Sequence, residues 1–153
     1  MLPELKTFLI AMLPIIELRG AIPIALEIYK IPIWSAYLFS VLGNLASLIL
    51  IILILDPVSQ FLSKNFYFFK QFFTWLFTHT RKIHQSKIKK WGKNLTVIFL
   101  IATPIPFIGG WTGAIAAFVF GISFKEALPL VAIGSLLAGI IVTILTLGVF
   151  KLI

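Results

Sequence analysis

The chain has 153 residues, of which 60% are hydrophobic and 12% are charged, and its mean hydropathy is +1.09. Soluble domains are nearer half apolar and a quarter charged, so this composition excludes an ordinary water-soluble globule and indicates one integral membrane domain over residues 1–153. The length allows about four crossings of about 20 residues each. The chain has no Cys, which excludes disulfides and thiolate metal sites, and its formal charge of +8 favours anionic lipid or an anionic substrate as a partner.

The first apolar block, residues 5–29, is interrupted by charges and by helix-breaking residues. Glu17 and Arg19 lie between two uncharged runs, 7–16 and 20–26, and each run is too short to cross a bilayer alone. The breaking residues are Pro14, Gly20 and Pro23. No small-residue cleavage site follows the apolar stretch, so we do not expect a cleaved signal peptide. The pattern predicts a broken, re-entrant hairpin.

Two blocks are typical of plain membrane-spanning helices. Residues 33–55 and 127–150 contain no ionisable side chain, and each is long enough to cross about 30 Å of hydrocarbon. In the second block, Ser135, Gly139 and Thr143 form a small-residue stripe that lets a neighbouring helix approach closely.

The segment between the halves, residues 57–93, is basic and aromatic. It contains eight of the thirteen Lys and Arg residues, which places it in the cytoplasm by the positive-inside rule. Eight of the twelve residues in 66–77 are aromatic. We expect an amphipathic helix in the headgroup layer, with Lys side chains reaching anionic lipid. Asp56, which precedes Pro57, is expected in a solvated turn, and we interpret Glu27 and Lys30 as interfacial anchors.

The last irregular block, residues 94–124, contains no ionisable side chain. As one helix it would be about 46 Å long, well beyond the hydrocarbon core. Prolines and glycines in its middle disfavour a continuous helix. The residues of this break are Pro104, Pro106, Gly109, Gly110, Thr112 and Gly113. We predict a second re-entrant hairpin, whose exposed turn amides and carbonyls can line a cavity.

Together these blocks predict an all-α membrane protein with an inverted repeat. A hairpin and a transmembrane helix (1–56) precede the basic segment (57–93), and a second hairpin and helix (94–153) follow in the opposite orientation, as in many secondary transporters. In this arrangement both termini are outside. The alternative is four complete crossings, which would place both termini inside.

Glu17 and Arg19 are the candidate site residues, because ionisable residues at membrane depth are functional by default. A partly desolvated Glu17 can bind and release a proton, while Arg19 holds it or an anionic substrate group. The alternative is a structural ion pair that locks the hairpin. Asn44, in the middle of the first spanning block, is interpreted as a helix–helix contact, with cavity lining as the alternative.

The sequence offers little for enzymatic chemistry. The sole Asp is Asp56, neither His79 nor His84 lies at membrane depth, and no nucleotide-binding glycine motif is present. We therefore expect no catalytic residues, no metal, no cofactor and no nucleic-acid partner.

The stretch Pro14-Ile-Ile-Glu-Leu-Arg-Gly-Ala-Ile-Pro23 resembles the small multidrug export protein family, and 104–113 fits the second signature of that family. More distantly the chain is similar to the DedA family of the VTT superfamily. Members of that family carry two opposed re-entrant hairpins and are implicated in moving lipids or lipid-linked phosphates across membranes, some with proton or cation coupling. The resemblance implies that Glu17 is the acidic residue of the first hairpin and that Pro104 and Pro106 mark the second. DedA proteins carry arginines in the second hairpin, whereas this chain has none there.

We therefore expect a small multi-pass transporter or flippase of the cell (inner or plasma) membrane. It would move an amphipathic or lipid-like molecule, with proton coupling through Glu17, and a site built from two copies, a homodimer, would also fit. An uncoupled lipid- or anion-scrambling pathway is a further alternative. The rival of a different class is a non-transporting membrane scaffold or assembly protein in which Glu17 and Arg19 form a structural ion pair.

Overall fold

A computed structural model describes residues 1–83, 87–105 and 108–152, and over these residues the regular structure is helical, with a single isolated bridge between Ile105 and Ile108. The elements are α1 (Pro3–Met12), α2 (Glu17–Pro23), the π-helix η1 (Ile24–Ile28), α3 (Ile33–Asn65), α4 (Tyr67–Ile83), α5 (Lys87–Ala102), α6 (Gly110–Val119) and α7 (Phe124–Leu152). The expected all-α class is confirmed.

Helices α3 and α7 are the two elements long and apolar enough to cross a membrane among the residues described. At 1.5 Å per residue they are about 50 and 44 Å long. Their outward side chains are apolar as well: Ile54 on α3 is 55% exposed and Ile144 on α7 is 65% exposed. A helix that is hydrophobic all round is typical of contact with lipid.

Helix α3 continues past the expected turn at Asp56 and ends at Asn65, so the prediction of a turn is wrong. Proline removes one amide donor, but its fixed φ is compatible with a helix, so a long helix can continue through Pro57. The hydroxyl of Ser59 donates to the Asp56 carbonyl at 2.8 Å. Asp56 is thus an exposed residue on a helix.

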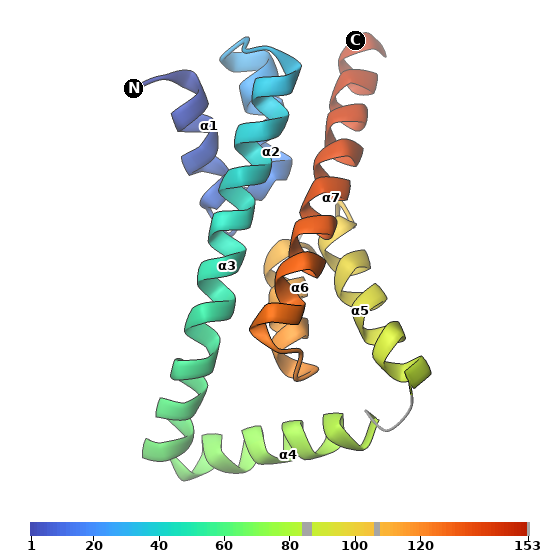
Figure 1. The fold of residues 1–153 in the computed structure, drawn as a ribbon. Helices are drawn as coiled ribbons and strands as arrows, with labels where there is room; N and C mark the ends of the chain where they lie inside the picture. Colours follow the sequence, from blue (N-terminus) through green and yellow to red (C-terminus); the bar gives the residue numbers. More distant parts are fainter. Residues whose placement is uncertain (84–86, 106–107, 153) are drawn as a thin grey trace.

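Helix α1 and the run α2–η1 form a helical hairpin, joined by residues 13–16 (Figure 1). The chain breaks around Pro14 as expected, since α1 ends at Met12. Gly20 and Pro23, however, lie inside the returning helix, which widens into the π-helix immediately after the proline. The hairpin packs closely on α3 at Gly43. A Cβ atom there would lie 2.2 Å from the carbonyl oxygen of Phe8, so only glycine allows this approach.

Helices α5 and α6 form a second helical hairpin, joined by the segment 103–109. The break expected from prolines and glycines is present, although Gly110 and Gly113 belong to the first turn of α6 and Pro106 lies outside the described residues. Ile101 of α5 fills the space beside Gly113 and Gly134, where a Cβ would lie 2.2 and 2.7 Å from its side chain. This contact joins the second hairpin to α7.

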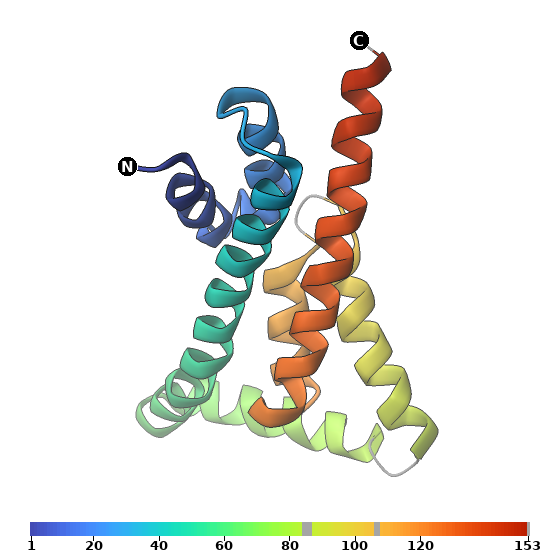
Figure 2. The ribbon, with the colours of Figure 1, turned by 45° about the horizontal axis from the view of Figure 1, so that its top comes forward.

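The two halves of the chain meet along α3 and α7. The amide of Asn44 donates to the hydroxyl of Ser135 at 3.2 Å, and both side chains are buried. A Cβ at Gly139 would lie 2.7 Å from the ring of Tyr37, so the small-residue stripe of α7 faces α3. Both termini lie at the end of the molecule opposite α4, which runs crosswise beneath the other helices (Figures 1 and 2). A helix within 66–77 was expected, and the structure confirms it.

Candidate functional site

Glu17 is the first residue of α2, and it lies where the turn of the first hairpin passes into the returning helix. Its φ of 49° lies in the left-handed region, which costs a non-glycine residue about 1–2 kcal/mol. The side chain is buried, and its Oε1 accepts a hydrogen bond from the backbone amide of Trp111 at 3.2 Å. Trp111 lies in the first turn of α6, where the helix dipole favours a negative charge. The carboxylate of the first hairpin therefore binds the start of α6 in the second.

Arg19, two residues further along α2, binds the turn of the second hairpin. Its Nη2 donates to the carbonyls of Thr103, at 2.7 Å, and Ile108, and its Nη1 donates to that of Ile105. Proline and glycine leave carbonyls of such a turn without helical partners, and a turn at membrane depth needs other donors to replace them. The planar guanidinium, with five N–H donors, supplies them.

The two side chains also form an ion pair, with Arg19 Nε 3.8 Å from Glu17 Oε2. Gly109 lies against both. A Cβ at this position would be 2.0 Å from Arg19 Nη2 and 2.9 Å from Glu17 Oε2. Only a residue without a side chain leaves room for the pair, and this is the structural role of the first glycine in the Gly109-Gly110 sequence.

A cavity of about 580 Å³ lies beside this ion pair. Its lining residues come from the turns of both hairpins and the start of α6: Pro14, Ile15, Ile16, Glu17, Arg19, Gly20, Pro104, Gly109, Trp111, Thr112 and Ile115. The size falls in the range of small-molecule pockets, and the wall is mainly apolar with a few polar groups, as such pockets usually are.

The structure gathers most of the predicted site residues at this cavity, but not all of them. Among the predicted site residues that the structure describes, those that do not line it are Pro23, Asn44, Gly110 and Gly113, and Pro106 lies outside the described residues. Gly110 packs against Leu48, and a Cβ there would lie 3.4 Å from Asn44 Oδ1, so Asn44 is near the site without lining the cavity. Among the described side chains, no group of three His, Cys, Asp or Glu is placed to hold a metal ion.

Sequence reasoning missed two contributors to the site. Trp111 was considered only as part of the second break and was given no role of its own, yet its amide binds Glu17 and the residue lines the cavity. The carbonyls of the 103–108 turn were expected to be exposed, whereas Arg19 occupies three of them. Backbone amides and carbonyls are present in residues of every type, so the spacing of residue types in the sequence did not reveal these partners.

Two long apolar helices, with two shorter hairpins joined over a partly buried ion pair, define a small helical membrane protein with a polar site between its halves. The chain belongs to the family described as "Putative small multi-drug export protein", which it matches over residues 17–141. The matched region begins at Glu17 and includes the whole of the second hairpin. Comparisons with curated proteins and with solved structures gave no match.

Proposed function

We propose that the chain is a small secondary transporter or flippase that moves an amphipathic or lipid-like molecule through the cavity between the hairpin turns. The observation that carries this proposal is the contact of Glu17 and Arg19 with the second hairpin at the cavity wall. Ionisable groups at membrane depth mark transport pathways and proton relays. Export is also what the family name describes.

In this proposal the two hairpins enter the bilayer from opposite sides and form an inverted repeat with α3 and α7. Transporters of this design bind their substrates near the midplane, where discontinuous helices meet. Support comes from the placement of both termini at the end opposite α4, as two re-entrant hairpins require (Figure 1). The DedA resemblance agrees with this arrangement.

Within this mechanism Glu17 binds and releases the coupling proton, and Arg19 positions the second hairpin. We do not assign Arg19 to anion binding, because its donors already bind three carbonyls and the carboxylate of Glu17. The rest of the cavity wall is mainly apolar. An amphipathic molecule with a large apolar part therefore fits better than a highly charged phosphate compound.

The cavity itself provides the first test. Replacing Ile115, which lines it, with Trp is expected to fill part of the space and to reduce the flux of an amphipathic fluorescent dye into proteoliposomes at least several-fold. The matched control is Leu136→Trp, a similar enlargement at an exposed apolar position on α7. Equal flux in the two variants would reject the cavity as the pathway.

The membrane arrangement is tested with a reporter fused to the C-terminus. We expect the reporter to be external, because α7 crosses once after an inward-opening second hairpin. An internal reporter would favour four complete crossings and would remove the inverted repeat. A reporter inserted in the basic 57–93 segment is the internal reference.

A second candidate function, a non-transporting scaffold, is favoured by the number of bonds that Arg19 makes between the hairpins. It predicts that Arg19→Ala lowers yield and melting temperature while no flux above that of empty vesicles is found for any variant. Measurable flux in the wild-type chain that is lost with Glu17→Gln would reject it.

A further inference from the structure

Helix α4 is a separate feature that the site does not use. It lies crosswise to α3 and α7, at the end of the molecule where α3 ends and α5 and α7 begin (Figures 1 and 2). A helix in this position lies parallel to the surface of a bilayer that α3 and α7 cross.

One side of α4 is aromatic, beginning with the first residues of the helix. Phe69 and Phe73 stack with ring centroids 6.5 Å apart, and Phe73 meets Phe118 of α6 edge-to-face at 6.4 Å. Next to Phe69 and Phe73, the side chains of Phe68 and Phe72 are 73% and 47% exposed. Aromatic side chains with so much exposed surface are typical of the layer between headgroups and hydrocarbon.

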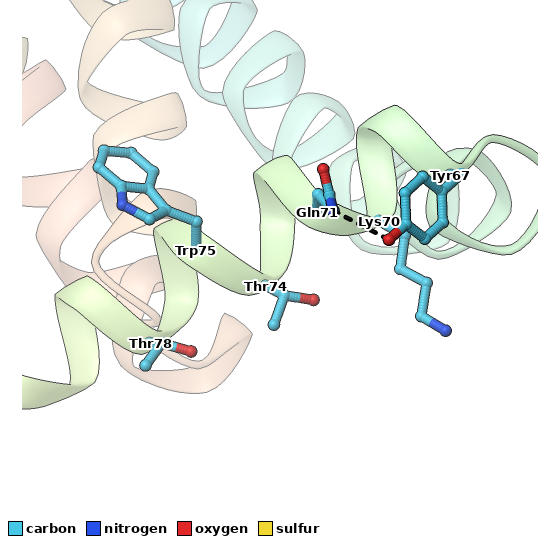
Figure 3. Close-up of a pocket in the computed structure, with 6 residues that line it drawn as sticks. All are labelled: Tyr67, Lys70, Gln71, Thr74, Trp75 and Thr78. Atoms are coloured by element: carbon cyan, nitrogen blue, oxygen red, sulfur yellow. Dashed lines mark hydrogen bonds between the residues drawn. The ribbon is translucent and has the colours of Figure 1, made fainter.

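The other side of α4 is polar. Tyr67, Gln71, Thr74 and Thr78 follow one another at helical spacing around an open hollow of about 700 Å³, and Lys70 and Trp75 complete its lining, with Trp75 at the border of the aromatic side. Figure 3 shows Lys70 directed away from the ribbon and Gln71 bonded to Tyr67, a contact of 3.0 Å. The helix is therefore amphipathic, with a strong separation of aromatic and polar sides.

The segment of the chain that contains α4 carries charge of one sign. Residues 57–93 contain eight Lys and Arg, and no Asp or Glu occurs between Asp56 and Glu126. In water alone the exposed aromatic side chains of this segment stay unburied, and its positive charges repel one another. Next to a negatively charged surface, exposed cations such as Lys64 and Lys70 are attracted and the exposed aromatic side chains are covered at the same time. Lys93 is buried over the ring of Phe120 and is not part of this surface.

We propose that α4 is a docking surface for the anionic headgroups of the bilayer in which the chain resides. The aromatic side enters the boundary between headgroups and hydrocarbon, and the basic side chains contact lipid phosphates. Phe73 of α4 contacts Phe118 of α6, so α4 connects the bound lipid to the helix whose first turn binds Glu17. This docking is independent of whether the chain transports a substrate.

The test uses a variant that keeps Trp75, which is 61% exposed on α4, and has Phe at the other three Trp positions. It is reconstituted in phosphatidylcholine vesicles containing either brominated phosphatidylcholine or brominated phosphatidylglycerol at the same mole fraction. We expect bromine to quench Trp75 in both, and more strongly in the anionic lipid. Equal quenching by the two lipids, or quenching by neither, would overturn the proposal, and quenching by neither would indicate a protein partner for α4 instead.

Charge variants show whether the lysines cause the preference. In K70Q/K82Q, the ratio of anionic to zwitterionic quenching is expected to fall toward one, as it should for the parent variant at high salt. The control variant K30Q/K151Q also removes two positive charges, one after η1 and one at the end of α7. It should keep the ratio of anionic to zwitterionic quenching of the parent variant. A ratio unchanged in K70Q/K82Q would overturn the assignment to headgroup charge.

The wild-type chain supplies a second measurement that needs no tryptophan substitution. In lipid nanodiscs, amide hydrogen exchange over residues 67–83 is expected to slow when phosphatidylglycerol replaces part of the phosphatidylcholine. Exchange in α7 should not change. Identical exchange in α4 with and without the anionic lipid would contradict the proposal.

Discussion

Replacing Glu17 with Gln is expected to abolish proton-driven flux in reconstituted vesicles, reducing it to the level of empty vesicles. Gln has nearly the same shape and its carbonyl oxygen can still accept the hydrogen bond from Trp111, but it cannot bind or release a proton. Arg19 keeps its three carbonyl partners, so the free energy of unfolding should fall by only about 1 kcal/mol. The measurement is dye flux against an imposed pH gradient.

Glu27→Gln is the matched control. Glu27 pairs with Lys30 at 3.2 Å on the exposed surface, so losing its charge should leave flux and stability unchanged. Undiminished, still pH-dependent flux in Glu17→Gln would reject proton coupling at Glu17. Flux that is insensitive to the proton gradient in the wild-type chain as well would favour an uncoupled scrambling pathway.

Replacing Gly109 with Ala is expected to separate the two hairpins and to remove flux together with much of the stability. The new Cβ would occupy the position of Arg19 Nη2. The guanidinium is the movable end of a long side chain, so the clash is relieved by moving it away from the carbonyls. Losing two charge-assisted hydrogen bonds at about 1.5 kcal/mol each gives a destabilisation of about 3 kcal/mol. Thermal unfolding in detergent measures it.

Gly92→Ala and Gly148→Ala are the controls, because a Cβ at either position meets no atom within 4 Å. Both glycines lie inside helices, so Ala should stabilise the chain by about 0.5–1 kcal/mol.

A double-mutant cycle tests whether Gly109 acts through Arg19. Since Gly109→Ala and Arg19→Ala break the same contact, the double variant should cost little more than the more harmful single variant. Additive losses would show that Gly109 acts independently of Arg19.

The sequence by itself determined the all-helical class, the two long apolar helices and the positions of the main breaks. Each of these follows from a property that a local stretch of residues carries: hydropathy over 33–55 and 127–150, and the missing amide donor or flexible backbone near Pro14 and Pro104. Local reasoning was wrong at Asp56, where the helix continues, and at Gly20 and Pro23, which lie inside a helix. Helical hydrogen bonds with neighbouring turns outweigh a single unfavourable residue in such positions.

The sequence also singled out Glu17 and Arg19, because charges are costly in an apolar segment. What they bind was decided by the tertiary structure alone. The partners of Arg19 are carbonyls about 85 residues further along the chain, and the partner of Glu17 is the amide of Trp111. Every residue carries such backbone groups, so residue type gives no indication of which ones remain unpaired until the fold brings the two hairpin turns together.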